Sequence, residues 1–134
     1  VICEPSQIIV GAGNEYLLML LSQILGADRR VAMESPTYVQ AYETFLNLGY
    51  QVCAVDMDAQ GIRMEQLRSE QADIAYVMPS HQFPMGTVMP MKRRMELLKW
   101  ECILFALVQN HYISIQKYLL IVRKKLKNRV EQLK

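Results

Sequence analysis

Three short segments of the sequence carry residues that could bind a ligand, and each follows an apolar stretch. The first is Gly-Ala-Gly-Asn at positions 11–14, where glycines would let the backbone approach a phosphate at the free N–H groups of a helix N-terminus. Tyr38, which follows Pro36, could stack on a planar heterocycle. His81 lies in the proline-flanked segment 79–86 and could act as an acid, a base or an orienting group.

Each of these segments also has a purely structural interpretation. A dinucleotide-binding fingerprint would need a third glycine where the chain has Tyr16, and a P-loop would need a Gly-Lys-Ser/Thr string that is absent. The glycine segment could be a plain strand-to-helix turn, Tyr38 a half-buried helix cap, and His81 a residue that bonds nearby backbone. The Arg93-Arg94 pair is most simply part of a solvated helix face.

The spacing of apolar residues predicts the elements that position these segments. We expect strands at 8–10, 31–33, 51–55 and 74–78, a turn at 56–61, and helices at 14–25, 39–48, 64–70 and 90–100. This alternation is typical of an α/β fold with a largely parallel sheet. Because parallel sheets place ligand sites at the carboxyl ends of their strands, the three segments are expected at one edge of the sheet.

Two of the helices carry patterns that predict their burial. The helix at 14–25 is apolar nearly all round, which favours a fully buried helix that ends at Gly26. In the helix at 90–100, the residues Met91, Met95 and Leu98 fall on one face, which is expected to be the apolar face.

The last part of the chain differs from the rest in charge. Residues 1–100 carry 8 Lys+Arg and 11 Asp+Glu, a net charge of −3, whereas residues 101–134 carry 7 and 2, a net charge of +5. Apolar residues recur every three or four positions from Tyr112 to Leu133, with lysines opposite, so a basic amphipathic helix is predicted. Such a helix could simply pack with a solvated face. The run 102–108 could be a strand or the start of that helix.

Composition excludes several classes of protein. The 134 residues suffice for one domain or a piece of one, and a hydrophobic share of 51% argues against disorder. Three cysteines without a C-x-x-C spacing argue against a disulfide framework or a zinc site and suit reduced thiols in the cytoplasm. No secretory signal and no membrane-spanning run is expected. Val1 in place of methionine indicates a reading frame that begins upstream.

Five ordered strings carry a family resemblance: Val-Gly-Ala-Gly-Asn at 10–14, Glu-Ser-Pro-Thr-Tyr at 34–38, Asp-Met-Asp-Ala-Gln-Gly-Ile at 56–62, Pro-Ser-His-Gln-Phe-Pro-Met-Gly at 79–86 and Arg-Arg-Met-Glu-Leu-Leu-Lys-Trp at 93–100. Together they resemble part of the large domain of fold type I, pyridoxal-phosphate-dependent class I/II aminotransferases. The last two strings are most similar to the aminotransferase-like domain of MocR-type regulators of the GntR family. The resemblance covers about residues 1–100.

The resemblance implies a role for each segment. Ala12, Gly13 and Asn14 would hold the phosphate of pyridoxal 5'-phosphate, Tyr38 would stack on its ring, and the loop that begins at His81 would line its edge. The family asparagine that bonds the ring hydroxyl is Phe83 here, so that contact is not expected. In the parent family the ligand is an amino acid or amine and the protein is a homodimer.

Other family features have no counterpart in this sequence. The Schiff-base lysine and the aspartate that faces the pyridine nitrogen are not found, and no aspartate follows Asp73. We therefore expect a truncated, catalytically incomplete domain at 1–100 joined to an unrelated basic helical tail at 101–134, as a frame disruption near residue 100 would produce. Direct DNA contact is not expected without the regulators' N-terminal DNA-binding domain. The alternative is an interaction module that uses the basic helix to bind a partner helix, acidic lipid or nucleic acid.

Overall fold

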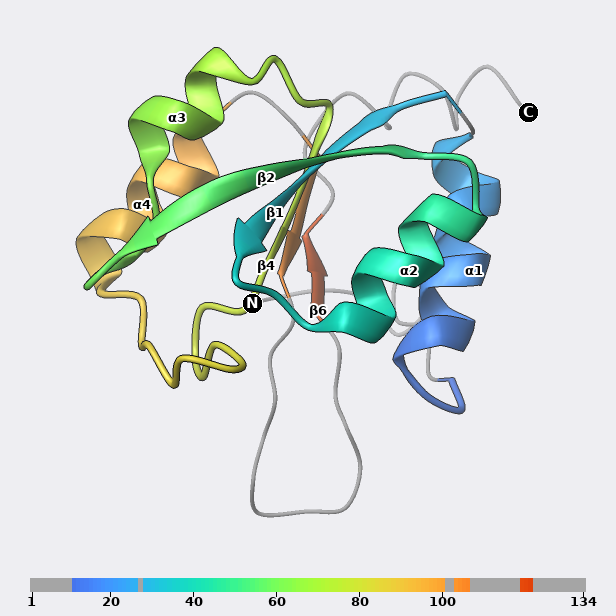
Figure 1. The fold of residues 1–134 in the computed structure, drawn as a ribbon, viewed down its shortest axis with the longest axis horizontal. Coiled ribbons are helices and arrows are strands. Elements are labelled where there is room, and N and C mark those ends of the chain that lie inside the picture. The colour runs from blue at the N-terminus through green and yellow to red at the C-terminus, as the bar shows by residue number, and fades with distance from the viewer. Residues whose placement is uncertain (1–10, 27, 101–102, 107–118, 122–134) are drawn as a thin grey trace.

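The computed structural model describes residues 11–26, 28–100, 103–106 and 119–121 (Figure 1). Within these residues the strands form one sheet in the order β3-β2-β1-β4-β5-β6. The neighbours β2–β1, β1–β4 and β4–β5 are parallel, whereas β3 and β6 run antiparallel at the two edges. The strands are β1 (Arg30–Ser35), β2 (Gln51–Asp58), β3 (Gly61–Ile62), β4 (Ile74–Val77), β5 (Ile103–Ala106) and β6 (Leu119–Ile121).

Helices cover both faces of this sheet. Helices α1 and α2 lie on one side and α3 and α4 on the other (Figure 1). Alternation along β1 divides the core accordingly: Val31 and Met33 pack with Phe45 of α2, whereas Ala32 packs with Leu67 of α3. The helices are α1 (Asn14–Leu25), α2 (Val39–Asn47), α3 (Met64–Ser69) and α4 (Met91–Lys99). The predicted α/β architecture with a largely parallel sheet is confirmed.

Most of the predicted elements are present within one or two residues of their expected bounds. Helix α1 begins and ends where its pattern predicts, and Gly26 follows it with φ 78°, a left-handed conformation that glycine adopts without strain. Strands β1 and β2 are longer than their apolar runs because parallel pairing continues to Ser35 and Asp56. The predicted strand at 8–10 lies outside the described residues.

Two predictions of burial are wrong. Helix α1 buries one stripe and leaves Tyr16, Met19 and Ile24 more than two-fifths exposed, because only one of its sides meets the sheet and α2. In α4 the buried residue is Leu97 and Leu98 packs partly against the same core, whereas Met91 and Met95 are exposed. Apolar composition therefore did not determine which side of either helix packs inward.

The segment 56–61, which the sequence predicts to be a turn, is mostly a hairpin. Strand β2 continues to Asp58, and Gly61 and Ile62 return along it as β3. Gly61 has φ 103°, and a Cβ there would stand 3.2 Å from the Met89 side chain, so glycine suits both the conformation and the packing. The hairpin thereby fits under the segment that leads into α4.

Beyond residue 100 the described segments extend the same sheet. β5 pairs in parallel with β4, so the ambiguous run 102–108 contains a strand. Leu119–Ile121 forms β6, antiparallel to β5, so the predicted basic helix is wrong at these residues. Three successive aliphatic residues fit a strand as well as a helical stripe, and backbone pairing with an available edge decides between them. The rest of the predicted helix lies outside the described residues.

Candidate functional site

The candidate site lies at the carboxyl edge of the sheet. β1 and β4 are adjacent and parallel, so the loops that follow Ser35 and Val77 emerge side by side. In Figure 1 the first turn of α1, the first turn of α2 and the loop before α4 all lie along the lower edge of the view. The loops after β1 and β4 therefore lie at the edge that the α/β pattern predicts, whereas the strand predicted before Gly11 lies outside the described residues.

Two hydrogen bonds join the loop after β1 to the loop after β4. The Met78 N–H donates to Oε2 of Glu34 at 3.0 Å, and Nε2 of Gln82 donates to the Pro36 carbonyl at 2.7 Å. Glu34 and Gln82 are each only 1% exposed. Buried hydrogen bonds of this kind are costly to break, because the freed groups have no water to bond. The sequence pattern does not single out either residue; the available signal is that two long polar side chains stand beside buried strand ends.

Gln82 also organises its own loop. Its Oε1 accepts the Met85 N–H at 3.0 Å, its backbone N–H donates to the Thr87 carbonyl at 3.0 Å, and its carbonyl accepts the Gly86 N–H at 2.6 Å. The loop is closed at its base, where the Met89 N–H donates to Pro79 at 2.9 Å. The segment 79–89 is therefore a compact loop with its ends together.

Tyr38 and Phe83 bring an aromatic surface to this edge. Their ring centroids are 6.2 Å apart and the rings are nearly perpendicular, an edge-to-face arrangement that aromatic pairs favour. Tyr38 is half-buried against the α1–α2 core, whereas Phe83 is 56% exposed. His81 is exposed on the same loop. Tyr38 and the His81 loop are thus brought together.

Burial changes the pKa of the Glu34 carboxyl group. Burial raises its pKa to about 7, although the hydrogen bond from the Met78 N–H acts in the opposite direction. Its other oxygen, Oε1, is buried and has no hydrogen-bond partner in the part of the chain that the structure describes. Near neutral pH the carboxyl group is therefore divided between its protonated and charged forms.

The Arg93-Arg94 pair does not form the solvated face that its sequence suggests. Arg94 donates from Nε to the Met89 carbonyl and from Nη2 to the Pro79 carbonyl, each at 2.8 Å, and so holds both ends of the 79–89 loop. Arg93 donates to the Ile62 carbonyl and pairs with Asp58 at 3.0 Å. Both half-buried guanidinium groups thus bind acceptors of the loop and the hairpin.

The start of α1, unlike the loops after β1 and β4, holds polar groups that have no hydrogen-bond partner among the described residues. Gly13 precedes the helix with φ 115°, and no side chain among the described residues caps it. Asn14 is 6% exposed, and neither Oδ1 nor Nδ2 has a hydrogen-bond partner within the described ranges. A Cβ at position 11 would stand 2.7 Å from Leu17 Cδ2, so a larger residue there would require the Leu17 side chain to shift. The first bond of the helix runs from Leu17 to Gly13, which leaves the earlier N–H groups available.

These features fit a phosphorylated, planar cofactor. Helix N–H groups and an unpaired buried carboxamide are donors for a phosphate, and the Tyr38–Phe83 pair offers an aromatic surface for a ring. Ala12 is exposed just before the start of α1. Within the described residues no cluster of three or more His, Cys, Asp or Glu side chains could hold a metal ion.

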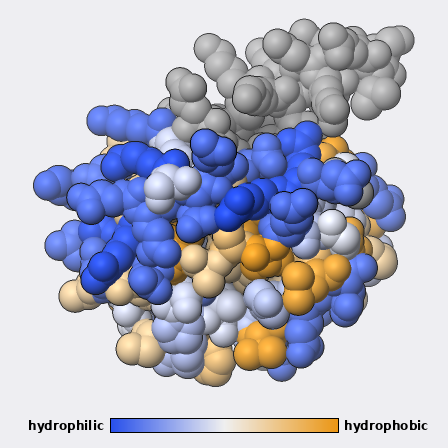
Figure 2. Space-filling view, turned by 45° about the horizontal axis from the view of Figure 1, so that its top comes forward, coloured by the Kyte–Doolittle hydropathy of each residue, from blue (hydrophilic) through white to orange (hydrophobic). Residues whose placement is uncertain are grey.

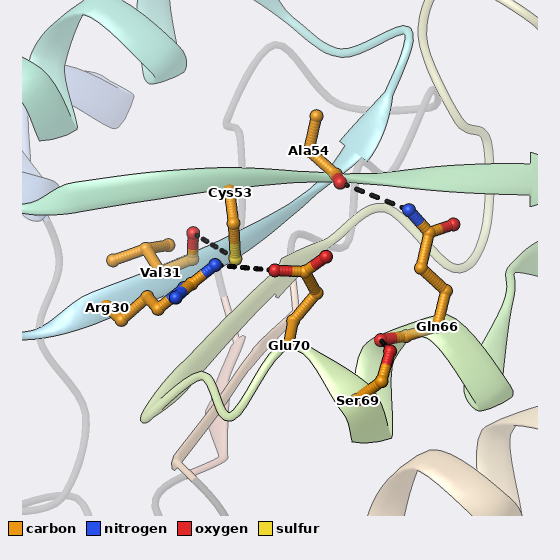
Figure 3. A network of polar contacts seen from close by, with 7 residues as sticks. All are labelled: Arg30, Val31, Cys53, Ala54, Gln66, Ser69 and Glu70. Atoms are coloured by element: carbon orange, nitrogen blue, oxygen red, sulfur yellow. Dashed lines mark hydrogen bonds and ion pairs between the residues drawn. The ribbon is translucent and has the colours of Figure 1, made fainter.

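The surface carries further features besides the polar contacts of this edge. Exposed apolar residues occur on α1 and α2 and on the loop before α4, and Figure 2 shows hydrophobic residues gathered on one flank of the molecule. At the opposite ends of the strands, Arg30 pairs with Glu70 at 2.6 Å next to Cys53 (Figure 3). That pair is partly exposed and contributes little to stability. None of the helices that the structure describes is long and apolar enough to cross a membrane.

Comparison with known proteins identifies relatives. No known family profile matches the chain. It is 38% identical over 98 residues to YdeL, an uncharacterised HTH-type transcriptional regulator of Bacillus subtilis, a match that covers 73% of this chain and 21% of that protein. It is 30% identical over 98 residues to the rhizopine catabolism regulatory protein MocR of Rhizobium meliloti, covering 72% of this chain and 20% of that protein. The chain thus spans only a small part of these relatives.

Solved structures with a similar fold are also aminotransferases. An archaeal alanine:glyoxylate aminotransferase superposes with a TM-score of 0.68 at 26% identity, over 77% of this chain and 29% of that one. The chain is a homologue of MocR-type regulators and of aminotransferases. The resemblance carried by the five strings is therefore confirmed, as is the fold of a partial aminotransferase large domain.

Proposed function

We propose that the carboxyl edge of the sheet binds pyridoxal 5'-phosphate. In this proposal Ala12, Gly13 and Asn14 hold the phosphate, Tyr38 contacts the ring face, and the loop that carries His81 lines the ring edge. The observation that carries the proposal is Asn14, a buried carboxamide without a partner among the described residues, at the start of a helix without a side-chain cap. A buried polar group of this kind is costly unless something bonds it, and a phosphate oxygen would accept from it.

The ring half of the site determines how the cofactor would lie. Phe83 would present an apolar edge where aminotransferases of this class have an asparagine, so the ring hydroxyl would receive no hydrogen bond from that position. Tyr38, half-buried and in contact with Phe83, would shield one face of the ring from water. When bound, the cofactor supplies an electron-accepting ring for chemistry on amino compounds.

We further propose that this chain binds the cofactor without covalent attachment and does not transfer amino groups. No residue of the sequence matches the family's Schiff-base lysine or pyridine aspartate. The proposed role is that of a ligand-binding fragment in the cytoplasm, with an amino acid or amine as the second ligand and a second copy of the chain as partner. Both are properties of the parent family. The matched domain is proposed to comprise residues 1–100, with β5 and β6 adding two strands to its sheet.

Titration of the chain with pyridoxal 5'-phosphate, followed by its absorbance band, tests the proposal. We expect saturable binding that Tyr38→Ala weakens and Tyr42→Ala leaves unchanged, because Tyr42 lies one turn further along the exposed side of α2. Borohydride treatment and mapping should recover no pyridoxyl-lysine. Binding that is equal in both tyrosine variants would contradict the proposed site, and a single modified lysine would contradict non-covalent binding.

A further inference from the structure

Two hydrogen bonds join the loops that follow β1 and β4. In the first, Glu34 at the end of β1 accepts a hydrogen bond from the backbone of Met78 at 3.0 Å. In the second, Gln82 from the other loop donates to the backbone of Pro36 at 2.7 Å. Each loop thus contributes one side chain and one backbone group. Two separate bonds restrict the rotation of one loop against the other, which a single bond would allow.

Both polar atoms of the Gln82 carboxamide form hydrogen bonds. While Nε2 reaches across to Pro36, Oε1 accepts the Met85 N–H of its own loop at 3.0 Å. The side chain is 1% exposed, so water cannot replace either bond. A movement of the 79–89 loop away from Pro36 would therefore break a buried hydrogen bond.

The two hydrogen bonds lie next to the aromatic pair of the candidate site, Tyr38 and Phe83. Tyr38 lies two residues after Pro36, and Phe83 is the next residue after Gln82. We infer that Gln82, together with Glu34, is a positioning residue that sets Tyr38 and Phe83 edge-to-face for a planar ligand ring. The identity of that ligand rests on the proposed function, whereas the geometry of the two loops does not.

The chain offers a matched control for this role. Gln66 of α3 also bonds with both ends of its carboxamide, accepting the Asp56 N–H at 2.9 Å and donating toward the Ala54 carbonyl at 3.5 Å (Figure 3). It lies on the opposite face of the sheet from Tyr38. Gln82→Glu and Gln66→Glu therefore make the same chemical change, and each replaces an amide donor with a carboxylate oxygen that faces a carbonyl.

The experiment measures the loop geometry and ligand binding separately, in the full chain. Nuclear Overhauser effects between the ring protons of Tyr38 and Phe83 report the aromatic contact, and titration with pyridoxal 5'-phosphate reports affinity. We expect Gln82→Glu to abolish the contact and weaken binding about tenfold, the range for loss of one buried hydrogen bond. Gln66→Glu should change neither. Glu34→Gln should also retain the contact, because its carbonyl oxygen still accepts the Met78 N–H.

A second variant guards against unfolding caused by a new buried charge. Gln82→Met removes both hydrogen bonds, has a similar length and introduces no charge, and it should also lose the Tyr38–Phe83 contact. If both Gln82 variants remain folded by circular dichroism and keep the contact, the inference is wrong. If the contact is lost as expected but the wild-type chain does not bind pyridoxal 5'-phosphate, the positioning role stands and the proposed function fails.

Discussion

The loops after β1 and β4 are joined by buried hydrogen bonds. The first turn of α1, in contrast, holds polar side-chain atoms that have no hydrogen-bond partner among the described residues. Gln82 uses both ends of its carboxamide, but Asn14, an equally buried carboxamide, uses neither. The first turn of α1 and the loop before α4, to which these residues belong, both lie along the lower edge of the view in Figure 1. In the proposed site this difference would make the ring half preformed and would leave the phosphate half to be completed by the ligand.

Removing a polar group should have opposite effects on stability in the two regions. Polar groups that are satisfied in the folded chain should stabilise it, and their removal should be costly. A buried polar group without a partner should destabilise the free chain, so its removal should be favourable in the absence of ligand and harmful in its presence.

The largest expected effect concerns Glu34. Its pKa of about 7 in the folded chain lies above the ordinary value of 4.5, so between these values the folded state binds a proton that the unfolded state has released. The free energy of unfolding should therefore fall as pH rises from 5 to 8, by about 3 kcal/mol at most. Urea unfolding at several pH values measures this. Glu34→Gln, which cannot ionise, should remove most of the slope; an unchanged slope in that variant would refute the assignment.

Arg94 should have the next largest effect because it binds both ends of the 79–89 loop. Arg94→Ala removes hydrogen bonds from a charged group to the Pro79 and Met89 carbonyls and should lower the free energy of unfolding by about 2 kcal/mol. Amide exchange at Met89 should accelerate more than exchange in α1. Lys92→Ala, an exposed neighbour on the same helix, is the control and should change stability little. Equal losses in the two variants would show that the carbonyl contacts do not matter.

Asn14 should show the reverse sign. Asn14→Leu replaces a buried, unpaired carboxamide with an apolar side chain of similar size and should raise the free energy of unfolding by about 1 kcal/mol. The same variant should bind pyridoxal 5'-phosphate more weakly. Asn47→Leu, at the exposed end of α2, corrects for helix propensity and surface hydrophobicity. A loss of stability specific to Asn14→Leu would mean that its carboxamide is satisfied and that the two halves of the site do not differ.

The sequence predicted the order of elements well because each depends on local signals. Helix α1 combines a long apolar run with a terminal glycine, and both of its bounds are correct. The hairpin at β3 and the strand at Leu119–Ile121 were not predicted, because both depend on pairing with a distant edge. Burial of individual helix sides also depends on the neighbours that each helix meets in the fold.

The site was predicted in part for the same reason. The position of the loops after β1 and β4 at one edge follows from the parallel strands, and it requires no knowledge of side chains. The roles of Gln82, Glu34 and Arg94 arise from contacts across 15 to 46 positions of sequence. Such contacts leave no local pattern, since a glutamine or arginine near a loop is ordinarily a surface residue.

The smallest expected effect sharpens the account of the phosphate half. Glu15, in the first turn of α1, has Oε2 only 3.6 Å from the position of a Cβ on Gly13, so its charge lies where an anion would bind. A carboxylate there stabilises the helix slightly and competes with a phosphate for the same N–H groups. Glu15→Gln should therefore tighten the binding of inorganic phosphate about threefold at low ionic strength, and 0.5 M salt should reduce the gain because it screens exposed charges. Glu43→Gln on α2 provides the control. An equal gain in both variants would indicate a general effect of net charge and would remove the first turn of α1 from the site.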